Sequence, residues 1–263
     1  MPFTLAHAAA AIPFRRTPLI PSALVVGCFS PDFEYFLRLA PRGGFGHTPI
    51  GVFAFDLPIS VVVLWLYHAY AKEPVLDWLP ETVRQRRPIS SIPPLSDARQ
   101  IVLILVSIII GAATHILWDS FTHPSRWPYH HWPFLRRAIQ LPIVGPVPCF
   151  KILQHLSTVV GLAVLLLWFW HWYRNTNPNP SQRLERPRER ERAVLALICF
   201  IALGAALVRG VLGVGIPENL HEGAELIAEV GITAVTVFWL EVVAYGMLRA
   251  QRRTRNPLET KCS

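Results

Sequence analysis

The sequence predicts an all-α membrane protein, a polytopic bundle of about five transmembrane helices with short N-terminal helices packed at one membrane face. Of its 263 residues, 52% are hydrophobic and only 16% are charged, whereas a soluble domain carries about 25% charged residues. Five apolar runs approach or exceed the length of about 20 residues that a membrane-spanning helix needs. The basic residues gather between those runs, which is typical of topology signals.

The chain begins with two apolar segments that are too short to span a bilayer. Residues 3–12 are Ala-rich and predict a helix of two to three turns that ends at Pro13 and the following arginine pair. Residues 21–29 form the second segment, and a glycine-rich loop at 43–49 carries His47. We treat residues 1–48 as an N-terminal part that packs against the bundle.

The five apolar runs divide into two groups. Three fall within residues 49–173 and two within 193–248, ahead of a basic tail at 249–263. The runs cover residues 50–71, 100–118, 152–173, 193–214 and 224–248. Between them we expect a polar loop at 72–99, an aromatic and proline-rich loop at 124–150 that suits a membrane interface, and a charged cytoplasmic loop at 174–192. The whole chain, 1–263, is expected to form a single membrane domain.

The positive charges predict the orientation of the spans. Arginines concentrate in residues 174–192 and 249–263, while the loop at 215–223 has no Lys or Arg. The positive-inside rule places both basic regions in the cytoplasm, and the N-terminal segment and the 119–151 loop outside. The net charge of +8 therefore indicates contact with anionic membrane lipid. We expect no nucleic-acid partner, and the oligomeric state stays open.

A polar triplet interrupts the end of the second apolar run. His115, Asp119 and His123 are spaced i, i+4, i+8, which places them on one face of a helix. Imidazole and carboxylate ligands suit Zn²⁺, Mn²⁺ or Fe²⁺. Polar groups at the edge of a membrane-spanning helix are costly and indicate function. The alternative is a set of interfacial side chains solvated by water, and we favour the metal site.

Topology brings further candidate ligands to the same membrane face. His47 precedes the first span, His155 begins the third, and His7 and Asp32 lie in the N-terminal part. An antiparallel bundle places these positions beside the end of the second span. We therefore predict a divalent metal ion, zinc before manganese or iron, at this face.

Other acidic residues within apolar runs leave alternatives open. Asp56 either lines an ion path or hydrogen-bonds the N-terminal segment. Glu225 and Glu229 either pair with Arg209, stay near an interface, or extend the metal cluster together with His221.

Four short motifs occur in a fixed order, and together they resemble a known family. They are residues 3–12, Ser30-Pro31-Asp32-Phe33-Glu34, Gly46-His47-Thr48, and residues 114–123. The set resembles a bacterial family of uncharacterised multi-pass membrane proteins, which is similar to the inner-membrane metal-dependent hydrolases and more remotely to zinc-dependent phospholipase C. The resemblance covers most of the chain and is strongest over residues 1–160.

The resemblance implies roles for the residues that match the motifs. The implied metal ligands are His7, Asp32, His47, His115 and Asp119, with His123 and His155 as additions. Glu34 stands where the hydrolases usually have Asp, and it is implied either to bind metal or to act as a catalytic base. Thr48 stands where the hydrolases tend to have Arg.

The expected function is hydrolysis by a membrane-bound, metal-dependent enzyme, acting on phosphoester bonds of lipid or lipid-linked substrates. Arg38, Arg42 and Arg126 are candidates for holding a head group. The rival interpretation is a non-catalytic membrane protein, transporter-like or structural, in which the His and Asp side chains bind a structural metal. The lack of an evident repeat pair and the position of the ligands at one face argue against transport.

Overall fold

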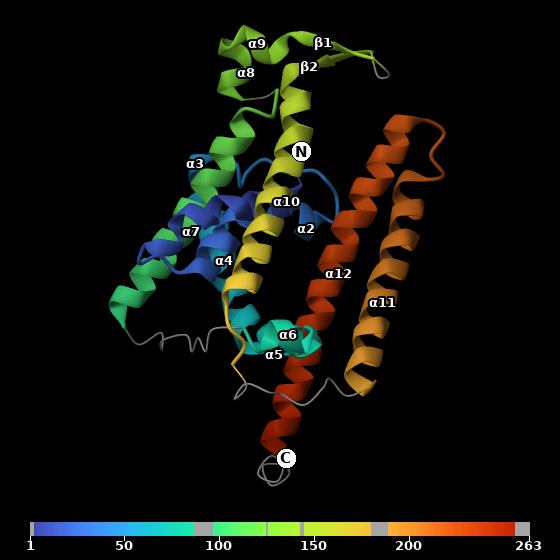
Figure 1. Ribbon diagram of the computed structural model, residues 1–263. Coiled ribbons are helices and arrows are strands. Elements are labelled where there is room, and N and C mark those ends of the chain that lie inside the picture. Colours follow the sequence, from blue (N-terminus) through green and yellow to red (C-terminus); the bar gives the residue numbers. More distant parts are fainter. Residues whose placement is uncertain (1–2, 87–96, 125, 143–144, 180–188, 256–263) are drawn as a thin grey trace. The chain divides into compact units, whose positions relative to one another are not determined.

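The computed structural model describes residues 3–86, 97–124, 126–142, 145–179 and 189–255, without the side chains of residues 220 and 221. Nearly all of its regular structure is helical (Figure 1), and the sheet that it describes is one two-stranded hairpin. The all-α prediction is confirmed. Five helices in this part of the chain are long and apolar enough to cross a membrane: Pro49–Trp78, Ala98–Ser120, Cys149–Asn175, Glu189–Val214 and Glu222–Arg255.

The chain divides into two compact units. Unit 1 comprises Met1–Phe33, Gly44–Val61 and Ser91–Asn175, and unit 2 comprises Glu34–Gly43, Val62–Ser90 and Thr176–Ser263. The expectation of a single membrane domain stays a prediction.

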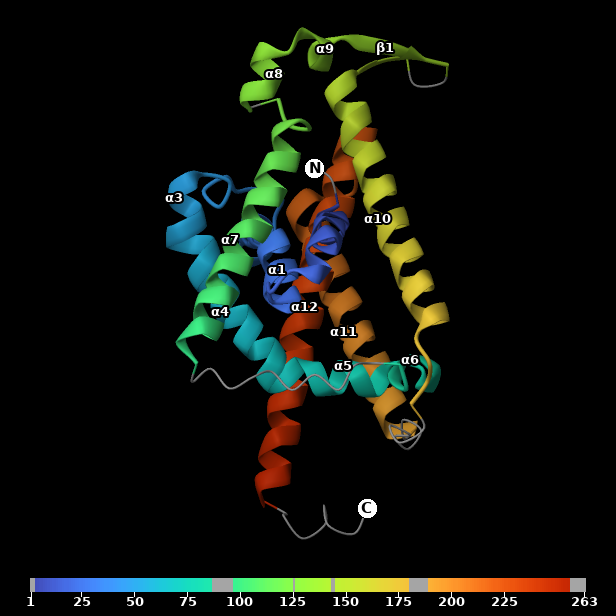
Figure 2. The same ribbon diagram turned by 60° about the vertical axis from the view of Figure 1, so that its left-hand side comes forward.

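The helices of unit 1 include both short N-terminal segments and two membrane spans. In chain order, its elements are η1 (Thr4–Arg16), α1 (Pro21–Phe29), η2 (Ser30–Asp32), α3 (Pro49–Gly51), η3 (Val52–Asp56), the first part of α4 (Leu57–Leu66), α7 (Ala98–Ser120), α8 (Trp127–His131), α9 (Pro133–Arg136), β1 (Ala138–Leu141), β2 (Gly145–Pro148) and α10 (Cys149–Asn175). Figure 2 shows η1 and α1 between α7 and α10, and η1 contacts all three of these helices.

Several predicted boundaries differ from the structure, and the last span continues into the predicted basic tail as far as Arg255. The helix η1 is a 3₁₀ helix that continues through Pro13 to Arg16, because one missing N–H removes only one bond from its ladder. Residues 72–78, expected in a polar loop, continue the first span as helix α5. The aromatic loop at 124–150 contains two short helices and the β1–β2 hairpin, in which Ile139 pairs with Val147.

Two prolines lie inside the first span, and each follows a π-helical turn. Pro58 comes just after η3, and Pro74 follows η4 (Tyr67–Ala71). A proline ring normally clashes with the carbonyl four residues before it. The wider π turn, whose bonds run from i to i+5, relieves this crowding and lets the helix continue.

The contact between α1 and α7 is formed backbone against backbone. A Cβ atom on Gly27 would lie 2.3 Å from the Ile108 carbonyl oxygen, and one on Gly111 would lie 2.3 Å from the Leu24 carbonyl oxygen. Ala112 and Ala23 are also fully buried. Small residues of this kind allow helices in a membrane to approach closely, and here they fix the position of α1 along α7.

Unit 2 is a second helical assembly around α11 (Glu189–Val214) and α12 (Leu220–Arg255), which pack along each other. It also contains α2 (Phe33–Arg38) from Glu34 onward, η4, α5 and α6 (Glu81–Arg84). Its apolar cluster consists of Ala71, Ile198, Val242 and Val243. Polar contacts join its helices as well: Arg249 donates to Asp77 at 2.7 Å, and Arg209 donates to Glu229 at 3.1 Å. The second contact realises, for Glu229, the alternative of pairing with Arg209.

The glycine contact predicts a specific sensitivity to added side-chain volume. Gly111→Ala should lower the free energy of unfolding by about 1–3 kcal/mol, because the new methyl group forces α1 and α7 apart. The measurement is the thermal unfolding midpoint of the purified protein in detergent. Gly204→Ala in α11 is the matched control, since a Cβ atom there meets no described atom within 4 Å. Equal midpoints for the two variants would contradict the packing argument.

Candidate metal centre

Five buried side chains from four elements of unit 1 converge at the C-terminal end of α7. His7 comes from η1, Asp32 from η2, His47 from the loop before α3, and His115 and Asp119 from α7. None of the five is more than 5% exposed. The structure thus brings together all five ligands that the resemblance implied as the main set.

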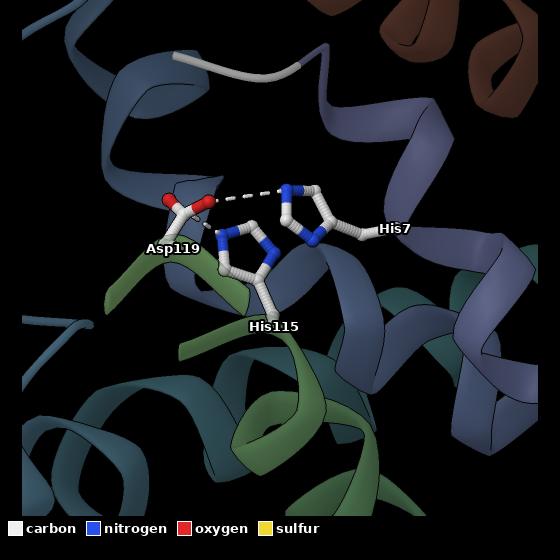
Figure 3. A group of neighbouring side chains, drawn as sticks. All are labelled: His7, His115 and Asp119. Carbon is white, nitrogen blue, oxygen red and sulfur yellow. Dashed lines mark ion pairs between the residues drawn. The ribbon is translucent and has the colours of Figure 1, made fainter. Parts of the chain in front are cut away.

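Asp119 lies at the centre of this group, and its two carboxylate oxygens face different histidines. Its Oδ1 is 3.4 Å from His7 Nε2, and its Oδ2 is 3.5 Å from the Nε2 atoms of both His47 and His115. Asp32 Oδ1 is 3.7 Å from His47 Nε2 and 3.6 Å from His115 Nε2. Figure 3 shows the rings of His7 and His115 directed at Asp119, and these rings stack with centroids 3.8 Å apart.

The spacing of the donor atoms suits a metal ion. Zinc bonds of about 2.0–2.2 Å to nitrogen and oxygen place tetrahedral ligand atoms about 3.3–3.6 Å apart. The nitrogen–oxygen distances among His47, His115, Asp32 and Asp119 are 3.5–3.7 Å. Two overlapping groups can hold an ion: His7, His115 and Asp119, and Asp32, His47 and His115.

The hydrogen bonding of the group also fits a cation. Within the described residues, both Asp119 oxygens, Asp32 Oδ1, and the Nε2 atoms of His7 and His115 are buried without a hydrogen-bond partner. Buried polar atoms are normally satisfied, and buried carboxylates need a compensating positive charge. Burial lowers the pKa of His7, and this effect outweighs the opposing attraction of Asp119. A neutral histidine offers a lone pair to a metal ion.

Surrounding groups fix the orientation of the candidate ligands. His115 Nδ1 lies 2.7 Å from the Cys28 carbonyl oxygen. Because a carbonyl can only accept, Nδ1 carries the proton and Nε2 keeps its lone pair for the centre. Thr4 Oγ1 donates to Asp32 Oδ2 at 2.6 Å, and Arg126 donates to the His47 carbonyl oxygen at 3.1 Å.

The remaining predicted site residues lie in different surroundings. His123 is at the edge of the group: its side chain is 23% exposed, and its Nδ1 lies 3.6 Å from Asp119 Oδ2 and 3.0 Å from the Asp119 carbonyl oxygen. His155 is exposed on α10 and belongs to neither potential ligand group, so the structure does not bring it to the centre. Glu34 is buried in unit 2, 3.5 Å from an Arg38 nitrogen, and its catalytic role stays a prediction.

The acidic residues outside the main set have separate outcomes. Asp56 is fully buried in η3, and its Oδ1 lies 2.7 Å from the position that a Cβ atom on Gly46 would occupy. A glycine at this position allows the loop carrying His47 to approach η3 closely. The cluster proposed around His221 involves a side chain outside the described residues.

Three supporting contacts were not predicted from the sequence. The Cys28 carbonyl is a backbone atom and leaves no residue-type signal. Arg126 contacts a residue 79 positions away, so only folding reveals the contact. Thr4 was the one with a usable signal, because it lies within the same short motif as His7.

Comparison with known proteins identifies the family of the chain. Residues 1–247 match the domain of unknown function DUF4184. The match covers most of the chain, which therefore belongs to this family. No curated protein and no solved structure matches it.

The contact between Thr4 and Asp32 predicts an effect on metal affinity. Thr4→Val keeps the side-chain shape but removes the hydrogen bond to Asp32 Oδ2, so metal affinity should fall about 10- to 100-fold, as for other groups that orient ligands. The measurement is titration of the metal-stripped protein with Zn²⁺. Thr17→Val, which removes an exposed local hydrogen bond to Phe14, should leave the affinity unchanged. Equal affinities of the two variants would exclude an orienting role for Thr4.

Proposed function

We propose that this protein is a membrane-bound, metal-dependent hydrolase that acts on phosphoester bonds of lipid or lipid-linked substrates. One observation carries the proposal: five buried His and Asp side chains form a potential metal site at the end of a membrane-spanning helix. Membership in DUF4184 assigns no activity, so the proposal depends on this geometry.

The number of donors supports a reactive site over a closed one. Each of the two potential ligand groups contains three residues, one fewer than the four protein ligands that close a tetrahedral structural site. The groups share His115, and in the first of them His7 Nε2 and Asp119 Oδ1 face each other at 3.4 Å. Three ligands in each group support an ion that keeps one position for water, or two ions. The partly exposed His123 beside Asp119 supports access from the surface.

The proposed chemistry follows from this donor set. A bound divalent ion, zinc before manganese or iron, supplies Lewis acidity that lowers the pKa of water toward about 7 and stabilises charge on a phosphoryl oxygen. His7, Asp32, His47, His115 and Asp119 would hold the ion. Arg126 already contacts the His47 loop with one of its five N–H donors, which suits it to orient an anionic phosphate beside the centre.

The depth of the centre supports a lipid substrate. From Ala98 to Asp119, α7 rises about 32 Å at 1.5 Å per residue, close to the hydrocarbon thickness of about 30 Å. The ligands thus belong near the head-group layer, where phosphoesters of lipids lie. Arginines at the ends of α10 and α12 support a cytoplasmic location for those ends. The centre then belongs at the outer face of the bacterial cytoplasmic membrane.

The alternative function is a non-catalytic membrane protein with a structural metal. The burial of all five candidate ligands favours it, because a structural zinc site is closed by protein ligands. A bound metal without any hydrolytic activity would support this alternative.

Removal of two central ligands tests the proposed function. The double variant His115→Ala/Asp119→Ala should lose bound metal and all hydrolysis of phosphoester and lipid-linked substrates. Metal content of the detergent-purified protein and substrate turnover are the two measurements. His155→Ala is the matched control, since this exposed histidine lies outside both ligand groups, and it should retain both properties. If the well-folded wild type contains no metal, the hydrolase proposal is wrong.

Metal binding should also stabilise the fold, whatever its role. At a free ion concentration 100 times the Kd, about 2.7 kcal/mol of stabilisation is expected. The measurement is the thermal midpoint of the chelator-treated protein before and after Zn²⁺ is added back. The same addition should leave the midpoint of the His115→Ala/Asp119→Ala variant unchanged. An equal rise in both proteins would mean that the ion binds elsewhere.

A further inference from the structure

A group of exposed apolar side chains lies beyond the ends of the two membrane spans of unit 1. Helices α8 and α9 and the β1–β2 hairpin join α7 to α10, at the top of Figure 1. We call these four elements the interfacial segment. Its exposed large apolar residues are 37–62% exposed: Trp127, Trp132, Phe134, Ile139 and Leu141. Apolar surface of this kind marks a site of interaction with a partner or a membrane.

The interfacial segment is held firmly on the two spans. Leu135 of α9 is fully buried. The Tyr129 and Phe150 rings lie 5.2 Å apart, which ties α8 to the start of α10, and the Phe121 and Trp132 rings lie 5.3 Å apart at the end of α7. These contacts fix the level of the segment relative to the spans, so the position of the spans in the bilayer sets its depth.

The hairpin carries larger apolar side chains on one face than on the other, where Gln140 is accompanied by Ala138, Pro146 and Pro148. Side chains alternate along a strand, so Ile139 and Leu141 lie on one face of β1 and Gln140 lies on the other. Val147, the cross-strand partner of Ile139, extends the apolar face. Both faces of β1 are exposed in the protein itself, so the difference between them is not explained by packing against the described chain.

Basic side chains accompany this apolar surface. Arg136, Arg137 and Lys151 are all exposed, and none of them forms an ion pair with the residues that the structure describes. Trp and Tyr side chains favour the layer between lipid head groups and acyl chains. Basic residues at this layer attract anionic lipids.

We propose that the interfacial segment lies in the head-group layer of the bilayer crossed by α7 and α10, on an anionic lipid surface. The apolar face of the hairpin contacts acyl chains, and Arg136 and Arg137 contact lipid phosphates. The continuity of the segment with two membrane spans selects lipid as the occupant over a soluble partner. Because Trp127 follows His123 by four residues, this anchoring holds the candidate metal centre at head-group depth. The proposal does not depend on metal binding or hydrolysis.

The test compares neighbouring positions of the hairpin in the full-length protein. Single variants Ile139→Cys and Gln140→Cys are placed in nanodiscs that contain phosphatidylcholine and phosphatidylglycerol. Each is treated with a water-soluble maleimide. The labelled peptide that contains the new cysteine is followed by mass spectrometry, so the native cysteines need not be replaced. Both side chains are exposed in the protein. A difference between their labelling rates therefore shows that the bilayer shields one of them from water.

We expect labelling at position 139 to be at least tenfold slower than at position 140. Leu141→Cys provides a second reading of the apolar face, should the variant at position 139 fail to fold. Equal rates on the two faces would overturn the proposal, because the hairpin would then lie in water. The difference should narrow in phosphatidylcholine alone and in the Arg136→Gln/Arg137→Gln background. If the difference in labelling rate is the same under both of these changes, the proposed role of anionic lipid is wrong.

Discussion

The close contact of α1 with α7 is the constraint on which the candidate site depends. Gly27 and Gly111 let the two backbones meet without intervening side chains. His115 lies one turn along α7 from Gly111, and its Nδ1 atom is 2.7 Å from the Cys28 carbonyl oxygen. The same approach carries η2 and its Asp32 toward the α7 ligands. Helix packing, ligand orientation and the geometry of the centre thus follow from one arrangement of small residues.

The environment of the centre explains why its charges can be buried. Asp32 and Asp119 are almost fully enclosed, and their partners at the centre are histidines. Burial lowers the pKa of His7, so the His7 ring contributes a lone pair and not a positive charge. A divalent cation balances those carboxylates and uses the lone pairs of neutral imidazoles. The physical chemistry of burial and the donor geometry therefore favour the same occupant.

The two structural units illustrate two ways to use polar groups in a membrane protein. In unit 1 they gather around one centre at the end of α7. In unit 2 they form separate ion pairs between helices, such as Arg209 with Glu229 and Arg249 with Asp77. Paired charges of opposite sign satisfy each other and add rigidity. The unit 1 group leaves buried acceptor atoms unsatisfied within the described residues, which is why it carries the functional proposal.

The sequence by itself determined the five apolar spans and the common face of His115 and Asp119, because hydrophobic length and helical spacing are local properties. It also indicated His7, Asp32 and His47 through short motifs in a fixed order. Only the tertiary structure separated His155, which is exposed on α10, from this group. The order of the spans predicts the depth of a residue in the membrane but not the side of the helix on which it lies. The helical continuation through Pro74 and the Cys28 contact were likewise decided by packing, because neither a π turn nor a backbone carbonyl has a residue-type signal.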